Sequence, residues 1–407
     1  MSNIKEIQGG ICAPSGFKAA GIHCGIRKNK TKADLALIVS ETPCTAAGCY
    51  TQNLVKGAPL YVTKDNLENG IAQAIVCNSG NANTCNADGI EVAQEMCRIV
   101  AENTGLNAED IVVASTGVIG QPLDVTPIKN AMPDLVKALK EDGGHEAANA
   151  IMTTDTVEKE ISVEFEIGGK VCKMGGIAKG SGMIHPNMAT MLVFITSDVA
   201  ISKEMIKKAL SDDVRDTFNM ISVDGDTSTN DMVTLLASGK AGNPEITEDN
   251  DDYKSFCEAL NYITTTLCRK IAKDGEGATK LLECNVCGAK SVLDAKTIAK
   301  SIITSSLFKA AMFGADANWG RILCAIGYSG ANVDVTKVKV TLASVKGSIL
   351  VCENGSGVEF SEDDAKIILT EDEIIINITL GDGDASATAW GCDLTYDYVK
   401  INGDYRT

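Results

Sequence analysis

Short apolar runs recur along the chain, and most are bounded by clusters of Gly, Asn, Ser or Thr. Runs of this length between turn-forming residues predict buried β-strands. We predict strands at residues 35–39, 71–76, 111–114, 161–165, 171–174, 191–196, 338–342, 348–352 and 373–380. Strands are therefore expected from near the beginning of the sequence to near its end.

Other segments carry apolar residues three or four positions apart, which is the spacing of an amphipathic helix. These segments cover residues 91–103, 126–140, 202–217 and 253–273. Gly105 follows the first as a helix C-cap would, and Ser202 can act as an N-cap. Helices and strands alternate without strict βαβ order, so we predict an α/β protein, a mixed layered sandwich of sheets and helices.

The length of 407 residues indicates two or three lobes, because a single hydrophobic core rarely grows so large. The acidic stretch 243–252 has the composition of a linker between lobes, with a surface loop as the alternative. No fixed-period repeat is visible.

The formal net charge is −17 at pH 7, which argues against nucleic acid or an anionic membrane surface as a partner. Residues 1–10 lack the apolar region of a signal peptide, and no apolar run has the length of a transmembrane helix. The 15 cysteines are an odd number and are scattered, as in a protein with reduced thiols. We therefore expect a cytoplasmic protein.

Cys284 and Cys287 form a single Cys-x-x-Cys pair. A structural zinc site requires two further ligands, and the three histidines, His23, His145 and His185, are all distant in sequence. We expect no metal, although a metal- or amino-acid-binding protein without catalysis remains an alternative.

Common catalytic signatures are missing. The sequence has no Gly-x-Ser-x-Gly elbow, and three histidines offer few partners for a serine or cysteine nucleophile. Residues 175–181 are rich in glycine, but Lys179 precedes the second glycine of a phosphate loop. Residues 224–231 resemble a calcium loop without its closing glutamate. We expect no cofactor.

An enzyme with few histidines can use an N-terminal nucleophile. If the bond between Ala189 and Thr190 breaks, Thr190 gains a free α-amine, whose usual pKa is about 7.7–8.0 and which can act as the base for its own hydroxyl. Glycines and a proline precede it within residues 179–192. Most threonine hydroxyls are structural, so this segment alone favours a threonine in a core strand.

A resemblance extends along the whole chain. The run 185–192, His-Pro-Asn-Met-Ala-Thr-Met-Leu, resembles the self-cleavage motif of the ornithine acetyltransferase family, also called glutamate N-acetyltransferases. Further stretches that resemble the family are residues 14–21, 78–83, 115–120, 152–156, 223–231, 389–395 and 398–407. One departure is Gly403, where the family pattern has Ala; it removes no functional group.

The resemblance implies a role for each matching residue. Thr190 would be the nucleophile, and Thr116 with the backbone N–H of Gly117 would form its oxyanion hole. The substrate would be bound by Thr153, Lys179, Thr190, Glu276, Asn402 and Thr407. Cleavage would give an alpha chain, 1–189, and a beta chain, 190–407, that share one active site.

The implied reaction is a ping-pong acyl transfer from N2-acetylornithine to L-glutamate through acetyl-Thr190, with acetyl-CoA as an additional donor in some family members. The family also suggests a heterotetramer with two copies of each fragment. The main rival is a β-peptide aminopeptidase of related fold. Such enzymes use serine at the cleavage point, so Thr190, Asn402 and Thr407 argue against it.

Overall fold

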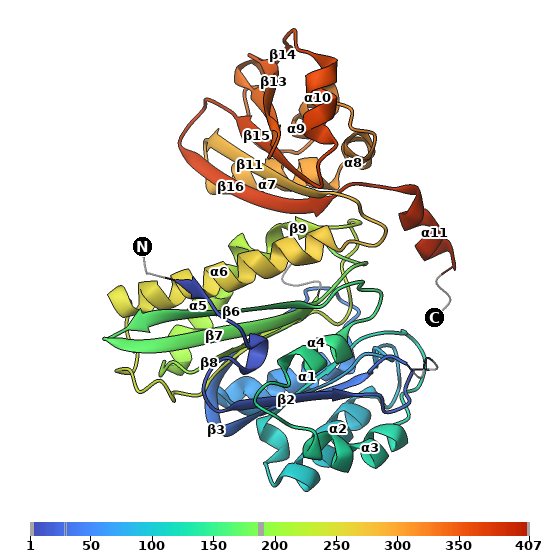
Figure 1. Cartoon of the computed structure of the whole chain (residues 1–407), viewed down its shortest axis with the longest axis vertical. Helices are drawn as coiled ribbons and strands as arrows, with labels where there is room; N and C mark the ends of the chain where they lie inside the picture. The colour runs from blue at the N-terminus through green and yellow to red at the C-terminus, as the bar shows by residue number, and fades with distance from the viewer. Residues whose placement is uncertain (1–3, 28, 30, 186–190, 405–407) are drawn as a thin grey trace.

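The computed structural model describes residues 4–27, 29, 31–185 and 191–404. It forms two bodies, each built on one β-sheet (Figure 1). Along the larger sheet the strand order is β1-β6-β7-β8-β10-β3-β4-β5, and β2 pairs with β3 outside this path. In the smaller sheet the order is β14-β13-β12-β15-β11-β16-β9. The predicted mixed α/β class is confirmed.

The larger sheet carries most of the early strands. Its members are β1 (Lys5–Glu6), β2 (Phe17–Ile22), β3 (Leu35–Tyr50), β4 (Ile71–Asn78), β5 (Ile111–Ser115), β6 (Lys159–Ile167), β7 (Lys170–Lys179), β8 (Leu192–Ser197) and β10 (Met232–Ala237). The smaller sheet consists of β9 (Ile221–Ser222), β11 (Leu281–Ala289), β12 (Lys339–Ser344), β13 (Gly347–Glu353), β14 (Ser356–Gly357), β15 (Glu373–Thr379) and β16 (Ala385–Cys392).

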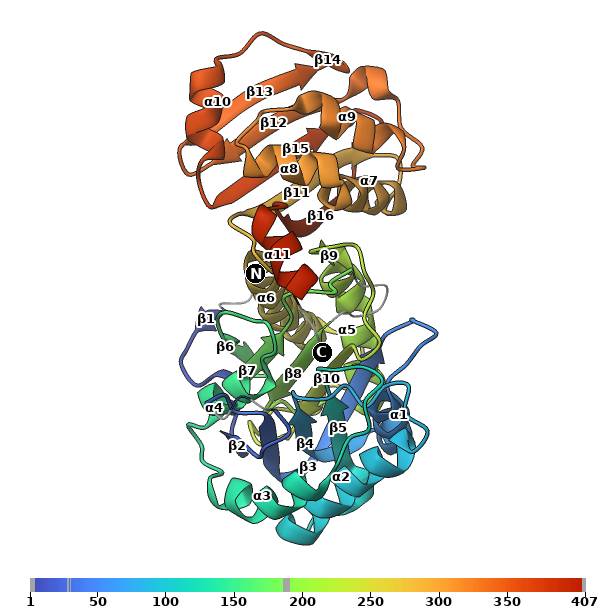
Figure 2. The same ribbon diagram turned by 90° about the vertical axis from the view of Figure 1, so that its right-hand side faces the viewer.

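Helices cover both sheets. Around the larger sheet lie α1 (Ala58–Asn66), α2 (Gly89–Thr104), α3 (Thr126–Lys137), α4 (Gly144–Ile151) and α5 (Lys203–Asp216). The smaller body contains α7 (Val292–Thr304), α8 (Ser306–Phe313), α9 (Trp319–Gly327) and α10 (Glu362–Leu369). Two more helices, α6 (Asp251–Lys273) and α11 (Tyr396–Asp404), lie at the junction of the bodies (Figure 2).

Helix α6 joins the two bodies into one core. It packs on β6 and β7 of the larger sheet and on β11 and β16 of the smaller one, and one cluster of buried apolar side chains runs through all of them. The side chains of Phe256, Leu260 and Ile263 are fully buried, as the helical spacing predicts. Asn250 caps the helix, since its Oδ1 accepts a hydrogen bond of 3.0 Å from the Tyr253 N–H.

The expected helix ends are mostly confirmed. Ser202 caps α5, where its Oγ accepts from the N–H of Met205, and Gly105 ends α2 with a left-handed φ of 77°. The helix predicted at 126–140 ends earlier, at Lys137, and the strand predicted at 35–39 continues to Tyr50. Propensity alone cannot set such ends, because neighbouring strands and turns decide them.

The glycine-rich stretch that begins at Gly175 continues strand β7 as far as Lys179. A Cβ at Gly175 would lie 1.9 Å from the Gly10 carbonyl oxygen, so glycine allows this close approach. The acidic stretch 243–252 is a surface loop and not a linker. The Asn243 side chain holds the backbone of Ala200, with its Oδ1 accepting at 2.8 Å, so this loop belongs to the larger body. The chain enters the smaller sheet at β9 and again at β11, after α6.

All 15 cysteines are free thiols. Cys284 is buried and Cys287 is exposed, so strand β11 directs the two side chains to opposite faces. Within the described part of the chain, no group of three or more potential metal ligands comes together. Nor does any described helix combine the length and the apolar character that crossing a membrane requires.

Candidate active site

A pocket of about 270 Å³ collects residues from distant parts of the sequence. Six residues that the resemblance selected line it: Thr116, Gly117, Thr153, Lys179, Glu276 and Asn402. The sequence analysis did not assign a role to eight others: Ala82, Ile119, Thr154, Gly182, Met183, Ser228, Thr229 and Asn230. The expected nucleophile Thr190, its neighbour Ala189, and Thr407 lie outside the described residues.

One wall of the pocket follows two parallel strands, and we call Thr116, Gly117 and residues 79–82 the oxyanion wall. Strands β4 and β5 pair in register to their carboxyl ends, where Asn78 faces Ser115. The next residue, Thr116, donates its N–H to the Asn78 carbonyl at 2.9 Å. Both strands are buried, so they form a rigid support for the residues that follow them.

Gly117 has a φ of +127°, which favours glycine. A Cβ at this position would lie 2.7 Å from the Gly80 carbonyl carbon and 2.8 Å from the Asn81 nitrogen. Among the described residues, neither the Thr116 hydroxyl nor the Gly117 N–H has a hydrogen-bond partner. Two donors at a pocket wall without internal partners are available for an oxygen of a ligand.

Asn230 fastens the oxyanion wall to the rest of the pocket. Its buried Nδ2 donates to the Ala82 carbonyl at 2.5 Å and to the Ser115 carbonyl at 2.9 Å. Its Oδ1 accepts from the Thr84 hydroxyl at 2.6 Å. Sequence reasoning missed this role, although Asn230 lies in the stretch 223–231 that resembles the family.

The opposite wall carries charge, and we call Lys179, Glu276 and Asn402 the head-group wall. Lys179 ends strand β7 and is 8% exposed, while Glu276 follows α6 and is half-buried. The Asn402 Nδ2 donates to Glu276 Oε2 at 2.8 Å. A cation and a carboxylate in one pocket suit a ligand that carries both charges, such as an amino acid.

Glu276 is held against the loop that follows Lys179. Its N–H donates to the Ser181 carbonyl at 3.0 Å. A Cβ at Gly182 would lie 2.3 Å from the Glu276 carboxylate carbon, so a larger residue there would displace this carboxylate. The carboxylate therefore lies directly beside the loop that follows Lys179.

The chain turns back after β16, and helix α11 lies between the two bodies (Figure 2). Asp393 Oδ1 accepts from the N–H of Thr279 at 2.8 Å and from that of Lys280 at 3.0 Å. The Thr395 hydroxyl then donates to the Gly277 carbonyl at 2.6 Å. These contacts hold the start of α11 against the end of α6 and so bring Asn402 to Glu276.

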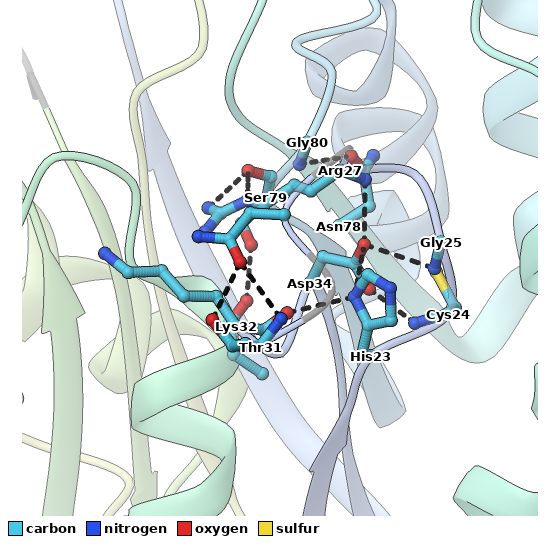
Figure 3. Close-up of polar contacts among 12 residues, drawn as sticks. His23, Cys24, Gly25, Arg27, Thr31, Lys32, Asp34, Asn78, Ser79 and Gly80 are labelled. Atoms are coloured by element: carbon cyan, nitrogen blue, oxygen red, sulfur yellow. Dashed lines mark hydrogen bonds and ion pairs between the residues drawn. The ribbon is translucent and has the colours of Figure 1, made fainter.

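Arg27 lies beside Ser79 of the oxyanion wall, and Figure 3 shows its polar contacts. Its Nε donates to the Ser79 carbonyl at 2.7 Å, and its guanidinium also donates to the Met152 carbonyl. The buried Asp34 carboxylate accepts from the Arg27 N–H at 2.9 Å and so orients this segment. Arg27 therefore links the loop of the oxyanion wall to the residue before Thr153.

His185 does not line the pocket. Its Nδ1 lies 3.1 Å from the Ser222 hydroxyl, and its carbonyl accepts from the Thr227 hydroxyl at 2.7 Å. Burial, together with the charge of Lys300, lowers the pKa of His185 to about 4. Its imidazole is therefore neutral at physiological pH and is not a base within this pocket.

Strand β8 begins next to the pocket. Its first residue, Leu192, pairs with Lys179, and the carbonyl of the preceding residue, Met191, accepts from the Met232 N–H at 2.9 Å. Met191 and Leu192 therefore lie close to the lysine of the head-group wall.

The sequence is similar to known proteins over nearly its whole length. The model of the ArgJ family matches residues 18–407. The arginine biosynthesis bifunctional protein ArgJ 1 of Clostridium acetobutylicum is 51% identical over 392 residues, which cover 96% of each chain. ArgJ of Bacillus subtilis is 47% identical over 408 residues, covering 99% of this chain and 98% of the relative.

A solved structure is also similar. The crystal structure of the arginine biosynthesis bifunctional protein argJ of Bacillus halodurans is 46% identical, with a TM-score of 0.51. The match covers 53% of this chain and 100% of the solved chain.

Fold and pocket together define an enzyme of mixed α/β architecture that acts on a small molecule. The chain belongs to the ArgJ family. It is an acyltransferase of arginine biosynthesis, and the similarity over nearly the whole chain disfavours the aminopeptidase alternative.

Proposed function

We propose that this enzyme is a glutamate N-acetyltransferase that carries an acetyl group from N2-acetylornithine to L-glutamate on Thr190. The observation that supports this most is the pocket itself. It combines two hydrogen-bond donors at Thr116 and Gly117, which have no partner in the described part of the chain, with the opposite charges of Lys179 and Glu276. The donors suit a developing oxyanion, and the charges suit an amino-acid substrate.

Thr190 acts first on its own peptide bond. Its Oγ attacks the Ala189 carbonyl carbon, the C–N bond breaks as the amine of Thr190 takes the hydroxyl proton, and water hydrolyses the resulting ester. The free α-amine of Thr190 then accepts the proton of its own hydroxyl in the transfer reaction. Two fragments result, an alpha chain of residues 1–189 and a beta chain of residues 190–407. In support, the whole solved Bacillus halodurans chain corresponds to only 53% of this one, about the share of the beta fragment.

In the first half-reaction, Thr190 Oγ attacks the acetyl carbonyl of N2-acetylornithine. The Thr116 hydroxyl and the Gly117 N–H donate to the negative oxygen of the tetrahedral intermediate, and each such donor typically contributes about 100- to 1,000-fold in rate. The C–N bond then breaks, ornithine leaves with the proton held by the α-amine, and Thr190 carries an acetyl ester.

In the second half-reaction, the glutamate amine attacks this ester. The oxyanion forms at the same donors, the C–O bond breaks, and the proton lost by the amine returns to Thr190 Oγ. N-acetylglutamate leaves. Neither half-reaction requires a redox cofactor, because acyl transfer to a hydroxyl and then to an amine is redox-neutral.

The head-group wall selects the substrates. Lys179 attracts a carboxylate, and Glu276, oriented by Asn402, attracts a free amine of ornithine or glutamate. Thr153 and Thr407 provide the remaining polar contacts. Both substrates are α-amino acids, so one pocket serves both half-reactions.

Further features follow from the same proposal. The two fragments stay associated because the pocket takes residues from both, and we expect a heterotetramer with two copies of each.

Acetyl-CoA is a second donor candidate, as the relatives are called bifunctional. The 15 free thiols support a cytoplasmic location.

An assay of the purified protein tests the proposal. Glutamate is offered with either N2-acetylornithine or acetyl-CoA, and N-acetylglutamate is measured. We expect product with N2-acetylornithine. Product with acetyl-CoA as well shows the bifunctional activity, and no product with either donor contradicts the proposal.

A further inference from the structure

Lys159, the first residue of β6, is completely buried behind the head-group wall. Its Nζ donates to Asp155 Oδ1 at 2.7 Å and to Asp274 Oδ2 at 2.5 Å. The Asp155 side chain is fully buried, and that of Asp274 is 6% exposed. One cation thus joins two carboxylates inside the protein.

Asp155 connects this ion cluster to two segments of the pocket. Its Oδ1 also accepts from the N–H of Gly180, the residue after Lys179, at 2.7 Å. Its Oδ2 accepts from the N–H of Thr153 at 2.9 Å. Burial by itself raises the pKa of the Asp155 carboxyl, but Lys179 and Lys159 together hold it below its usual range. Asp155 therefore stays charged and fixes both backbone segments.

Asp274 connects the same cluster to the end of α6. Its carboxylate accepts hydrogen bonds from Thr156, and its carbonyl accepts from the Ser181 hydroxyl at 2.7 Å. Glu276 follows two residues later and donates its N–H to the Ser181 carbonyl at 3.0 Å. The place of the Glu276 carboxylate therefore depends on where Asp274 is held.

We propose that Lys159 is a positioning residue that sets the separation of Lys179 and Glu276 and thereby determines how the enzyme recognises the amino-acid head group. Lys159 reaches Lys179 through Asp155 and Gly180, and it reaches Glu276 through Asp274. This inference rests on the proposed acetyltransferase function. It assigns Lys159 no contact with substrate.

A purely structural cluster is the alternative to this role. Buried ion pairs are often no more stabilising than apolar side chains of the same volume, because both charges lose their water. Here Asp155 also holds the segment that carries Lys179, and Asp274 holds the segment that carries Glu276. A shift of the cluster would therefore move both charged residues of the head-group wall. The oxyanion wall, mounted on β4 and β5, has no direct bond to it among the described residues.

The experiment compares a substrate that contacts both walls with one that needs only the oxyanion wall. Lys159→Met is compared with wild type on N2-acetylornithine, which uses both walls, and on p-nitrophenyl acetate, which has an acetyl group but no amino-acid head. The release of nitrophenolate in the first turnover reports acetylation of Thr190. We expect kcat/KM for N2-acetylornithine to fall about 100-fold, chiefly through KM, and nitrophenolate release to stay within about threefold per cleaved enzyme.

Two further variants control the test. Lys280 is also a buried lysine, but its Nζ binds the Met312 and Leu369 carbonyls in the smaller body, so Lys280→Met should leave the ratio of the two rates unchanged. If Lys159→Met does not fold or cleave, Asp274→Asn replaces it. That variant weakens the same cluster without changing its shape, and we expect about a tenfold selective loss with N2-acetylornithine.

The outcomes separate the two proposals. If both rates fall by the same factor in the Lys159 and Asp274 variants, or neither falls, the positioning role is wrong. If wild type transfers no acetyl group from N2-acetylornithine, the proposed function itself fails, whatever the variants do.

Discussion

The two walls of the pocket are built in different ways. The oxyanion wall continues two adjacent strands, β4 and β5, and offers a backbone N–H and one hydroxyl. The head-group wall gathers a strand end, a helix end and the folded-back tail, and it offers charged side chains. The first wall stays within one sheet and is fastened by Asn230, just before β10, whereas the second joins an end of that sheet to the residues after α6 and to helix α11.

This difference suggests that the two walls have different functions in the reaction. Donors that stabilise a transition state must be preorganised, and backbone on buried strands cannot relax away from the reacting atom. Groups that recognise two substrates in turn need charges that both substrates share, and they need a pocket open enough to admit either one. Changes in the oxyanion wall should therefore lower kcat, and changes in the head-group wall should mainly raise KM.

The largest effect should follow removal of the proposed nucleophile, Thr190. In Thr190→Ala, we expect a single uncleaved chain on denaturing electrophoresis and a loss of acetyl transfer of about 10,000-fold or more, because no hydroxyl is left to attack. Thr190→Ser keeps a hydroxyl and should still cleave. Formation of N-acetylglutamate by the alanine variant at an appreciable rate would show that another residue is the nucleophile.

Gly117→Ala should damage the oxyanion wall selectively. Its Cβ would lie 2.7 Å from the Gly80 carbonyl carbon, so the strand end must shift and the N–H must turn away from the oxyanion. We expect kcat to fall about 100- to 1,000-fold with little change in KM.

Gly120→Ala is the matched control for this change. Gly120 also has a positive φ, of 77°, but a Cβ there meets nothing within 4 Å. It should cost some stability, visible as a lower Tm, and leave kcat within about threefold. Equal losses of kcat in the two variants would mean that backbone strain matters and the oxyanion donor does not.

Glu276→Gln should damage the head-group wall selectively. The amide keeps the shape and can still accept from Asn402, but it lacks the charge that attracts an amine. We expect kcat/KM to fall about 30-fold for both substrates, equivalent to about 2 kcal/mol, with most of the change in KM. Steady-state kinetics with each substrate varied in turn measures this. A fall confined to kcat would place Glu276 in the chemical step instead.

Asn402→Ala should have the smallest effect. It removes the 2.8 Å hydrogen bond to Glu276 Oε2 at an exposed position, where water can replace the lost donor. We expect KM to rise about two- to fivefold with an unchanged kcat, which corresponds to roughly 0.5–1 kcal/mol. No change in KM for either substrate would show that the tail does not orient the carboxylate.

The oxyanion wall could be anticipated from the sequence better than the head-group wall. The run 111–114 predicted a buried strand, and Thr116 and Gly117 follow it directly. The approach of Asn402 to Glu276 could not be foreseen from local patterns, because it depends on Asp393 and Thr395 fastening the tail to residues 277–280. Only the resemblance to a family singled out these residues.

Other parts of the site escaped prediction for a similar reason. Asn230 and Lys159 act through hydrogen bonds to segments distant in sequence, and neither residue type has a spacing that reveals such partners. Buried polar groups of this kind break the apolar patterns on which strand prediction depends. The acidic stretch 243–252 left two interpretations open, because composition does not distinguish a linker from a surface loop. The contact of Asn243 with Ala200 shows that it is a loop of the larger body.

The central claim is that Thr190 carries the acetyl group. The most direct measurement mixes purified enzyme with N2-acetylornithine alone, quenches in acid and determines the masses of the two fragments. The account predicts two fragments divided at Ala189–Thr190, with one added acetyl group on the fragment that begins at Thr190 and none after glutamate is supplied. An uncleaved chain, or a Thr190 fragment that stays unmodified while N-acetylglutamate is still formed on addition of glutamate, would contradict it.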